Sequence, residues 1–313
     1  MSIWEILAII IGANAVILLF LMGWILYSIL LVRTSKKKWV RGASMPEDPE
    51  YAAMFREGER WRNDNALSMR EVTVKNGRLH LAGQYYDFGF DKAVIILPGR
   101  TETCYYSAFF AEPYKAAGYN VLTIDNRAHG LSDGHFNTLG YKESLDVIAW
   151  AKMLHEDLGI RRIFLHGVCI GSSTACYTLT RKECPDYIVG MAGEGMYTCF
   201  YETFLTHLKD QGHKPFPMGV MAMLELYLCT GSNVFSDGPK KRLPKLTKPI
   251  LMIHSKEDIY SLPEKAEIMY ETISAEKKMV WFEHGAHSRI RILSEENRKR
   301  YDGVIEDFLT NVF

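Results

Sequence analysis

The sequence predicts an α/β fold, in which a doubly wound, mostly parallel sheet carries a small helical cap and follows an N-terminal transmembrane helix. Three observations lead to this prediction. From about residue 70, short apolar runs typical of strands alternate with helical segments. About fifty residues with helical patterns interrupt this alternation late in the chain. An uncharged and mostly apolar run occupies residues 6–32.

The apolar run at the N-terminus predicts a membrane span. It reads ILAIIIGANAVILLFLMGWILYSILLV, 27 residues, and about 20 suffice to cross a bilayer as a helix. A cleaved signal peptide has basic residues before its apolar core, whereas here they follow it, in RTSKKKWVR. A buried core helix is the alternative, but such helices rarely run this long without one polar face. We therefore expect an uncleaved anchor in contact with the lipid bilayer.

The basic residues after the span also predict its orientation. Lys and Arg next to a span tend to remain in the cytoplasm, so we expect a single-pass protein of the cell membrane whose main domain faces the cytoplasm. The six cysteines show no CxxC pairs and no density typical of a disulfide-stapled domain, which suggests free thiols in a reducing compartment. The same spacing suggests no zinc site, and we expect no metal.

The chain divides into three predicted parts. Residues 1–34 form the anchor, residues 35–69 a connector, and residues 70–313 the main domain, with the helical cap at about 196–245. The connector contains PEYAAMFREGERWRN, which predicts an amphipathic helix on the domain or on the membrane surface.

The main domain begins with a predicted β-hairpin. REVTVKNGRLHLAGQYYDF alternates apolar and polar residues around Asn76 and Gly77, a pair that favours a tight turn. The alternation of strands and helices then implies right-handed crossovers and a parallel sheet covered on both faces. In chain order we expect the strand KAVIILPG, the helix SAFFAEPYKAAG, the strand NVLTID, the helix YKESLDVIAWAKMLHEDLG, the strand RRIFLHG, the strand KPILMIHS, the helix EKAEIMYETI, the strand KKMVWFE and the helix NRKRYDGVIEDFL.

The predicted cap contains CFYETFLTHLKDQ and PMGVMAMLELYLCTG, both with helical patterns. We expect it to cover the C-terminal edge of the sheet. Its apolar residues either pack on the domain or line an acyl or other apolar pocket, and the sequence does not separate the two.

The charge balance argues against a polyanionic partner. Lys plus Arg and Asp plus Glu both number 37, which gives a net charge of zero. Such a chain has no long-range field to attract a nucleic acid, so we expect none to bind. The sequence leaves the oligomeric state open.

A candidate nucleophile lies in RIFLHGVCIGSS, where a strand turns sharply into a helix. Gly167 and Gly171 flank Cys169 by two residues on either side, and such a strained turn needs small residues there. The N-terminus of the following helix favours the thiolate form of the cysteine. The alternative is a buried structural cysteine, the role expected for Cys176.

Ligands of an open α/β sheet bind beyond the C-terminal ends of its strands, so three further loops are candidate sites. In LPGRTE, Gly99 lets the backbone pass close to the nucleophile. The backbone amide of Arg100 could bind an oxyanion together with that of Ile170. The Arg100 side chain has no required role and could be a surface charge.

The other two loops carry a candidate acid and a candidate base. Asp258 follows the strand KPILMIHS, with neighbouring Glu257 as the fallback, and His287 follows the strand KKMVWFE, with His284 as its competitor. Asp258 could orient the imidazole of His287 and stabilise its charged form. Three other histidines have structural roles available near a strand end or turn: His129, His166 and His254. The order of nucleophile, acid and base is the one that α/β-hydrolases use.

From about Glu71 to the C-terminus the chain resembles the α/β-hydrolase superfamily. LPGRTE resembles the family's HG oxyanion turn with proline at the histidine position, DNRAHGLSDG resembles its D-x-R-x-x-G-x-S-x-G loop, and HSKEDIYSLPEKAEIMYE resembles its acid loop. Within the superfamily the chain is most similar to bacterial serine aminopeptidase-like and esterase-like hydrolases with short helical caps. The resemblance implies a doubly wound sheet, no metal or organic cofactor, and acyl transfer to water.

Cysteine in place of serine departs from most of that group and resembles dienelactone hydrolases, polyhydroxyalkanoate synthases and bile-acid acyltransferases. Thiolate attacks activated acyl groups well but is also a good leaving group, which favours esters and thioesters over amides. We therefore expect a membrane-anchored hydrolase that cleaves a small acyl substrate through Cys169, His287 and Asp258 and an acyl-enzyme intermediate. An acyltransferase with the same triad and an inactive hydrolase-like binding protein are the alternatives.

Overall fold

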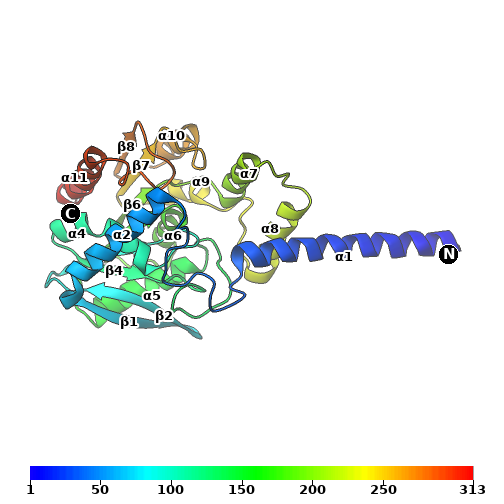
Figure 1. Ribbon diagram of the computed structural model, residues 1–313, viewed down its shortest axis with the longest axis horizontal. Helices are drawn as coiled ribbons and strands as arrows, with labels where there is room; N and C mark the ends of the chain where they lie inside the picture. Colours follow the sequence, from blue (N-terminus) through cyan, green and yellow to red (C-terminus); the bar gives the residue numbers. More distant parts are fainter. Residues whose placement is uncertain (313) are drawn as a thin grey trace.

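The computed structural model describes residues 1–312, which contain one eight-stranded sheet in the order β1-β2-β4-β3-β5-β6-β7-β8 (Figure 1). The strands are β1 (Met69–Asn76), β2 (Leu79–Tyr86), β3 (Lys92–Leu97), β4 (Asn120–Ile124), β5 (Arg162–Val168), β6 (Ile188–Glu194), β7 (Ile250–Ser255) and β8 (Lys277–Phe282). β1 and β2 form an antiparallel hairpin, β2 also pairs antiparallel with β4, and the pairs from β4 through β8 are parallel. The predicted α/β fold with a mostly parallel sheet is confirmed.

Helices cover both faces of the sheet, because the central strands are mostly apolar and are buried on both sides. On one face, α5 (Glu143–Glu156), α6 (Ile170–Leu179) and α10 (Pro263–Glu271) contribute Trp150, Cys176 and Met269 to an apolar core. On the other face, α4 (Glu112–Ala116) and α11 (Glu295–Val312) contribute Tyr114 and Phe308. The sheet is therefore the middle layer of three.

The structure differs from the prediction at two elements: one expected helix is divided, and one strand was not expected. The single helix expected through SAFFAEPYKAAG is wrong, because the chain forms α3 (Cys104–Ser107), a 3₁₀ turn at Ala108–Phe110 and then α4. Pro113 lies at the start of α4, where its missing N–H group is tolerated, and would have broken a longer helix. The strand β6 was not predicted, since its sequence IVGMAGE is rich in glycine and alanine, which disfavour strands.

The predicted amphipathic helix of the connector is α2 (Pro49–Asp64), and it packs on the domain. Asp48 caps its N-terminus by accepting a hydrogen bond from the Tyr51 amide. Its buried side includes Met54 and also Gly58, where a Cβ atom would lie 3.1 Å from the Phe109 nitrogen. Close packing against the segment after α3 thus favours the domain surface over the membrane surface.

α1 (Ile3–Leu31) is long and apolar enough to cross a membrane, and only 6% of its most apolar 18-residue window is buried. Such exposure is not that of a core helix. Figure 1 shows α1 projecting from the domain as a single rod whose C-terminal end meets the cap. There Gly23 packs so closely on α8 (Met218–Thr230) that a Cβ atom would lie 2.5 Å from the Cβ atom of Met221.

The cap lies between β6 and β7 and consists of α7 (Phe200–Asp210), α8 and the short α9 (Pro239–Arg242). These helices fall within the stretch in which the sequence predicted them. Phe204 and Ala222 of the cap share an apolar cluster with Tyr27 and Leu31 of α1. The cap therefore joins the N-terminal helix to the domain.

Candidate active site

Cys169 lies at the sharp turn between β5 and α6, which we term the nucleophile elbow (residues 167–171). Its φ of 55° and ψ of −114° are unusual for a residue other than glycine, and such strain is common at reacting side chains. A Cβ atom on Gly171 would overlap the Leu97 carbonyl oxygen, and one on Gly167 would overlap the backbone of Gly171. The predicted need for glycine at both positions thus has a steric cause.

Hydrogen bonds to β6 fix the elbow. The Cys169 amide donates to the Glu194 carbonyl oxygen at 2.9 Å. The hydroxyl of Ser172, which is fully buried, lies 2.7 Å from the Gly167 carbonyl oxygen and 2.8 Å from that of Glu194. The sulfur therefore has a defined position above the sheet.

His287, which is largely enclosed, and Asp258, which is buried, form a pair beside Cys169. The Nδ1 atom of His287 lies 2.7 Å from Oδ2 of Asp258. The other carboxylate oxygen accepts hydrogen bonds from the amides of Tyr260, at 2.9 Å, and Ser261, at 2.8 Å. Burial raises the pKa of Asp258, but the charge of His287 and these amides outweigh it and hold the pKa below its usual value. Asp258 is therefore ionised at neutral pH and fixed in orientation.

The remaining nitrogen of His287 faces the nucleophile. Nε2 is buried and makes no hydrogen bond within residues 1–312. Burial lowers the pKa of His287, but the neighbouring charges of Cys169 and Asp258 raise it well above its usual value. The arrangement thus favours an imidazolium at His287, between the Asp258 carboxylate and the Cys169 side chain.

The competing residues also form a pair, but at the surface. Nδ1 of His284 lies 2.8 Å from Oε1 of Glu257, and both side chains are exposed. The structure therefore joins His287 to Asp258 and His284 to Glu257, and only the first of these pairs interacts with Cys169.

Gly195 is part of this site, and the sequence analysis did not identify it. Its φ is 60°, and a Cβ atom there would lie 2.9 Å from Cε1 of His287 and 3.6 Å from Oδ2 of Asp258. Only glycine leaves room for the imidazole in its present position. The sole signal in the sequence was a glycine just after a strand that was itself missed.

The two predicted oxyanion amides belong to residues that line the same cavity as Cys169. Ile170 is the first residue of α6, and Arg100 lies in the loop after β3. The Arg100 carbonyl oxygen lies 2.7 Å from Nε2 of His129 and accepts a hydrogen bond from the Asn137 side chain at 3.1 Å. His129 therefore has a structural role, as its position suggested, because it helps to fix the loop after β3.

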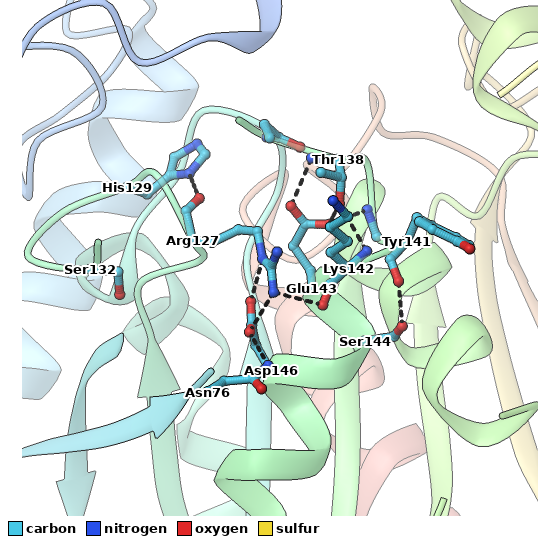
Figure 2. Close-up of polar contacts among 12 residues, drawn as sticks. Asn76, Arg127, His129, Ser132, Thr138, Tyr141, Lys142, Glu143, Ser144 and Asp146 are labelled. Carbon is cyan, nitrogen blue, oxygen red and sulfur yellow. Dashed lines mark hydrogen bonds and ion pairs between the residues drawn. The ribbon is translucent and has the colours of Figure 1, made fainter. Parts of the chain in front are cut away.

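A polar network holds the loop that carries His129 (Figure 2). Arg127 makes two hydrogen bonds of 2.7 Å to the carboxylate of Asp146, which also accepts one from Asn76. The Glu143 carboxylate accepts a hydrogen bond from the Thr138 amide at 2.8 Å. The Arg127 and Asn76 contacts tie DNRAHGLSDG to α5 and β1, and His129 in turn contacts the loop after β3.

The Arg100 side chain is not a surface charge. It lines the cavity beside Cys169, and its Nη1 atom donates to the Leu30 carbonyl oxygen of α1 at 3.2 Å. Burial lowers the pKa of Arg100, against the opposing effect of the charges of Cys169 and Glu102. A cationic group in contact with α1 thus lies next to the nucleophile.

The cavity has a volume of about 770 Å³, within the range of small-molecule sites. Apolar side chains of the cap form part of its wall, notably Phe200, Phe204 and Leu208 of α7, and α1 contributes Leu26 and Leu30. Of the two roles open for the cap, the structure supports both, since Phe204 packs in an apolar cluster and also lines the cavity.

Glu194, at the end of β6, is a further residue that the sequence analysis missed. It is fully buried, and its Oε2 atom accepts a hydrogen bond from the Tyr301 hydroxyl at 2.7 Å. Burial raises the pKa of Glu194 to about 7, and the charge of nearby His287 opposes that rise. It lies behind the triad, and a lone glutamate in a glycine-rich strand gave no signal of this position.

The other two histidines named in the sequence analysis, His166 and His254, are buried inside the domain. His166 is buried with Nδ1 2.8 Å from the Tyr114 hydroxyl. His254 belongs to β7 and is buried, with its ring centroid 5.7 Å from that of Trp281 in β8. All six cysteines are free thiols. Within the described part of the chain, no three His, Cys, Asp or Glu side chains cluster in a way that could hold a metal ion.

Comparisons with known proteins agree with this geometry. A family model described as the alpha/beta hydrolase fold matches residues 92–212. The chain is 28% identical over 221 residues to the uncharacterized protein YqkD of Bacillus subtilis, covering 70% of this chain and 71% of that protein.

Solved structures of hydrolases are also similar. The esterase PF2001 of Pyrococcus furiosus superposes with a TM-score of 0.68 at 22% identity, covering 80% of this chain and 94% of that one. The acylaminoacyl peptidase of Pyrococcus horikoshii gives 0.60 at 17% identity, covering 78% of this chain and 41% of that one. At such identities the likeness shows the fold. Together with the family match over residues 92–212 and the strand order, it shows that this chain has the α/β-hydrolase fold.

Proposed function

We propose that this hydrolase cleaves an ester or thioester of a small acyl substrate through a triad of Cys169, His287 and Asp258. The observation that carries the proposal is the buried His287–Asp258 pair, 2.7 Å apart, beside a strained cysteine at the nucleophile elbow. The reaction matches the chemistry of thiolate, which expels alkoxide and thiolate leaving groups more readily than amines.

In the first half of the reaction, the Cys169 thiolate attacks the acyl carbonyl carbon and forms a tetrahedral oxyanion. The amides of Arg100 and Ile170 stabilise the oxyanion by hydrogen bonds. The bond to the leaving group then breaks, and the Nε2–H of His287 gives its proton to the departing oxygen or sulfur. The product is a thioester on Cys169, and the imidazole is neutral.

In the second half, water attacks the thioester while neutral His287 accepts its proton. Collapse of the second oxyanion releases the carboxylic acid and restores the thiolate beside the imidazolium. Asp258 keeps its negative charge throughout and holds Nδ1 in place.

Membrane attachment through α1 is part of the proposal. The helix length and apolar surface support it, and the basic residues that follow, in RTSKKKWVR, support a cytoplasmic domain. A reporter fused to the C-terminus should behave as cytoplasmic, and a membrane-impermeant thiol reagent should not label exposed Cys229 in intact cells. Efficient labelling from outside would overturn this orientation.

Turnover of a panel of p-nitrophenyl esters and acyl thioesters by the purified full chain tests the activity. We expect hydrolysis by the wild type, loss of at least 100-fold in Cys169→Ala, and wild-type rates in the matched control Cys229→Ala, whose thiol is exposed on the cap. Product that forms only with an added alcohol, amine or thiol acceptor would indicate an acyltransferase. Absence of turnover with every substrate would favour the binding-protein alternative.

A further inference from the structure

α1 is longer than a membrane requires, and its two halves have different surroundings. At 1.5 Å per residue, 29 residues extend about 43 Å, whereas the hydrocarbon core is about 30 Å thick. Trp4 and Trp24 are both exposed and lie about 30 Å apart along the helix, the spacing expected of aromatic residues at the two interfaces. The residues after Trp24 then lie beyond the hydrocarbon core.

This last part of α1 belongs to the catalytic domain. Tyr27 and Leu31 are fully buried against the cap, and Gly23 allows the close approach of α8. On an adjacent stripe of the helix, Leu26 and Leu30 are one turn apart and line the cavity that contains Cys169.

Polar contacts hold this end of α1 in a fixed position. Arg100, in the loop after β3, donates to the Leu30 carbonyl oxygen at 3.2 Å. The Lys38 ammonium donates to the carbonyl oxygens of Ile29 and Val32, each at 2.6 Å. The helix is therefore a structural wall of the cavity and not a loose tether.

The cap beside this wall also exposes apolar side chains. Phe216, Tyr227 and Leu228 are exposed on or next to α8, the helix that packs on α1. Exposed aromatic and aliphatic residues next to a membrane helix are suited to the interfacial region of a bilayer. They place this face of the cap, next to the part of α1 that lines the cavity, at the membrane surface.

We propose that the cavity receives the acyl chain of a membrane lipid directly from the bilayer, guided along Leu26 and Leu30 of α1 to Cys169. This inference rests on the proposed membrane attachment, and it narrows the substrate class of the proposed hydrolase to lipid esters held in the membrane. A substrate that enters from water would need no wall built by the membrane helix.

Photo-crosslinking tests where the lipid chain lies without requiring turnover. Full-length Cys169→Ala protein is placed in phosphatidylcholine vesicles that contain a phosphatidylcholine with a diazirine in its acyl chain. We expect crosslinks on α7, at Phe200 and Phe204, in addition to those on the exposed part of α1. In Leu30→Trp the α7 crosslinks should fall at least five-fold, whereas Ile29→Trp, which places the same indole on the exposed face, should keep them.

Crosslinks confined to residues 3–22, or equal α7 crosslinking in Leu30→Trp and Ile29→Trp, would overturn the inference. Because this measurement does not depend on Cys169, it tests whether the lipid chain enters the cavity even if the protein hydrolyses nothing.

A kinetic measurement separates the inference from the proposed activity. The ratio of palmitoyl to acetyl p-nitrophenyl ester hydrolysis is compared in vesicle-bound wild type, Leu26→Trp and the exposed control Ile25→Trp. We expect Leu26→Trp to lower this ratio at least ten-fold, whereas Ile25→Trp should leave it unchanged. An unchanged ratio in Leu26→Trp, with active enzyme, would refute the acyl route along α1 and leave the hydrolase proposal intact.

Discussion

Two histidine–carboxylate pairs lie next to each other in this molecule and differ almost only in burial. His287 and Asp258 are 2.7 Å apart with 14% and 2% of their side chains exposed, whereas His284 and Glu257 are 2.8 Å apart with 73% and 55% exposed. Both pairs join the same two loops, after β7 and β8. In both, the carboxylate helps to raise the pKa of the histidine.

The comparison shows that a short distance between a histidine and a carboxylate is not sufficient to form a catalytic pair. Water surrounds and screens the outer pair, so its two charges interact weakly. The inner pair is enclosed, and its imidazole interacts with Cys169 on one side and Asp258 on the other. Burial and a third partner therefore distinguish the candidate site from a surface histidine–carboxylate pair of similar geometry.

The largest expected difference between the pairs is in catalysis. His287→Ala and Asp258→Asn should each lower kcat/KM by roughly 100-fold to 10,000-fold, because general acid–base assistance is lost. The matched changes His284→Ala and Glu257→Gln should alter it less than two-fold. Steady-state hydrolysis of the best substrate in the panel measures both. A comparable loss in His284→Ala but not in His287→Ala would reverse the assignment of the base.

A smaller effect should follow from moving His287 without removing it. Gly195→Ala places a methyl group 2.9 Å from the imidazole at a φ of 60°, whereas Gly77→Ala creates the same backbone strain, at a φ of 59°, with no atom within 4 Å. Both variants should lose about 1 kcal/mol of stability from the left-handed conformation. Only Gly195→Ala should also lose activity, by about 10-fold. Equal activity in the two would mean that the position of the imidazole does not limit the reaction.

The smallest expected effect is a change in the titration of the inner histidine. The Cys169 charge raises the pKa of His287 against the lowering effect of burial, so Cys169→Ala should lower that pKa. The pKa of His284 should stay unchanged, because Glu257 alone is its hydrogen-bond partner. NMR titration of the two imidazoles follows both in one sample. An unaltered His287 pKa in Cys169→Ala would show that no thiolate–imidazolium pair forms.

Local patterns predicted most of the fold. Apolar runs and turn residues marked the hairpin and most strands, since short-range periodicity and the Asn76–Gly77 pair determine them. β6 was missed because its two glycines and one alanine are weak strand formers, and its place between β5 and β7 is visible only in the assembled sheet. The break before Pro113 likewise depended on where the chain turns back over the sheet.

The same limit applies to the candidate site. Strand-end position and chain order predicted Cys169, Asp258 and His287, because parallel strands bring their C-terminal ends together. The approach of Gly195 to His287 and the contact between Arg100 and α1 depend on tertiary packing between distant segments. No pattern in one stretch of sequence encodes such contacts.

The most direct test of the central claim is intact-mass spectrometry of the full chain after rapid mixing with an acyl thioester. The account predicts a transient increase equal to one acyl group in the wild type, mapped by peptide analysis to Cys169. It should also appear in His284→Ala, form far more slowly in His287→Ala, and be absent from Cys169→Ala. Turnover without any adduct on Cys169, or an adduct that forms equally fast in His287→Ala, would contradict the account.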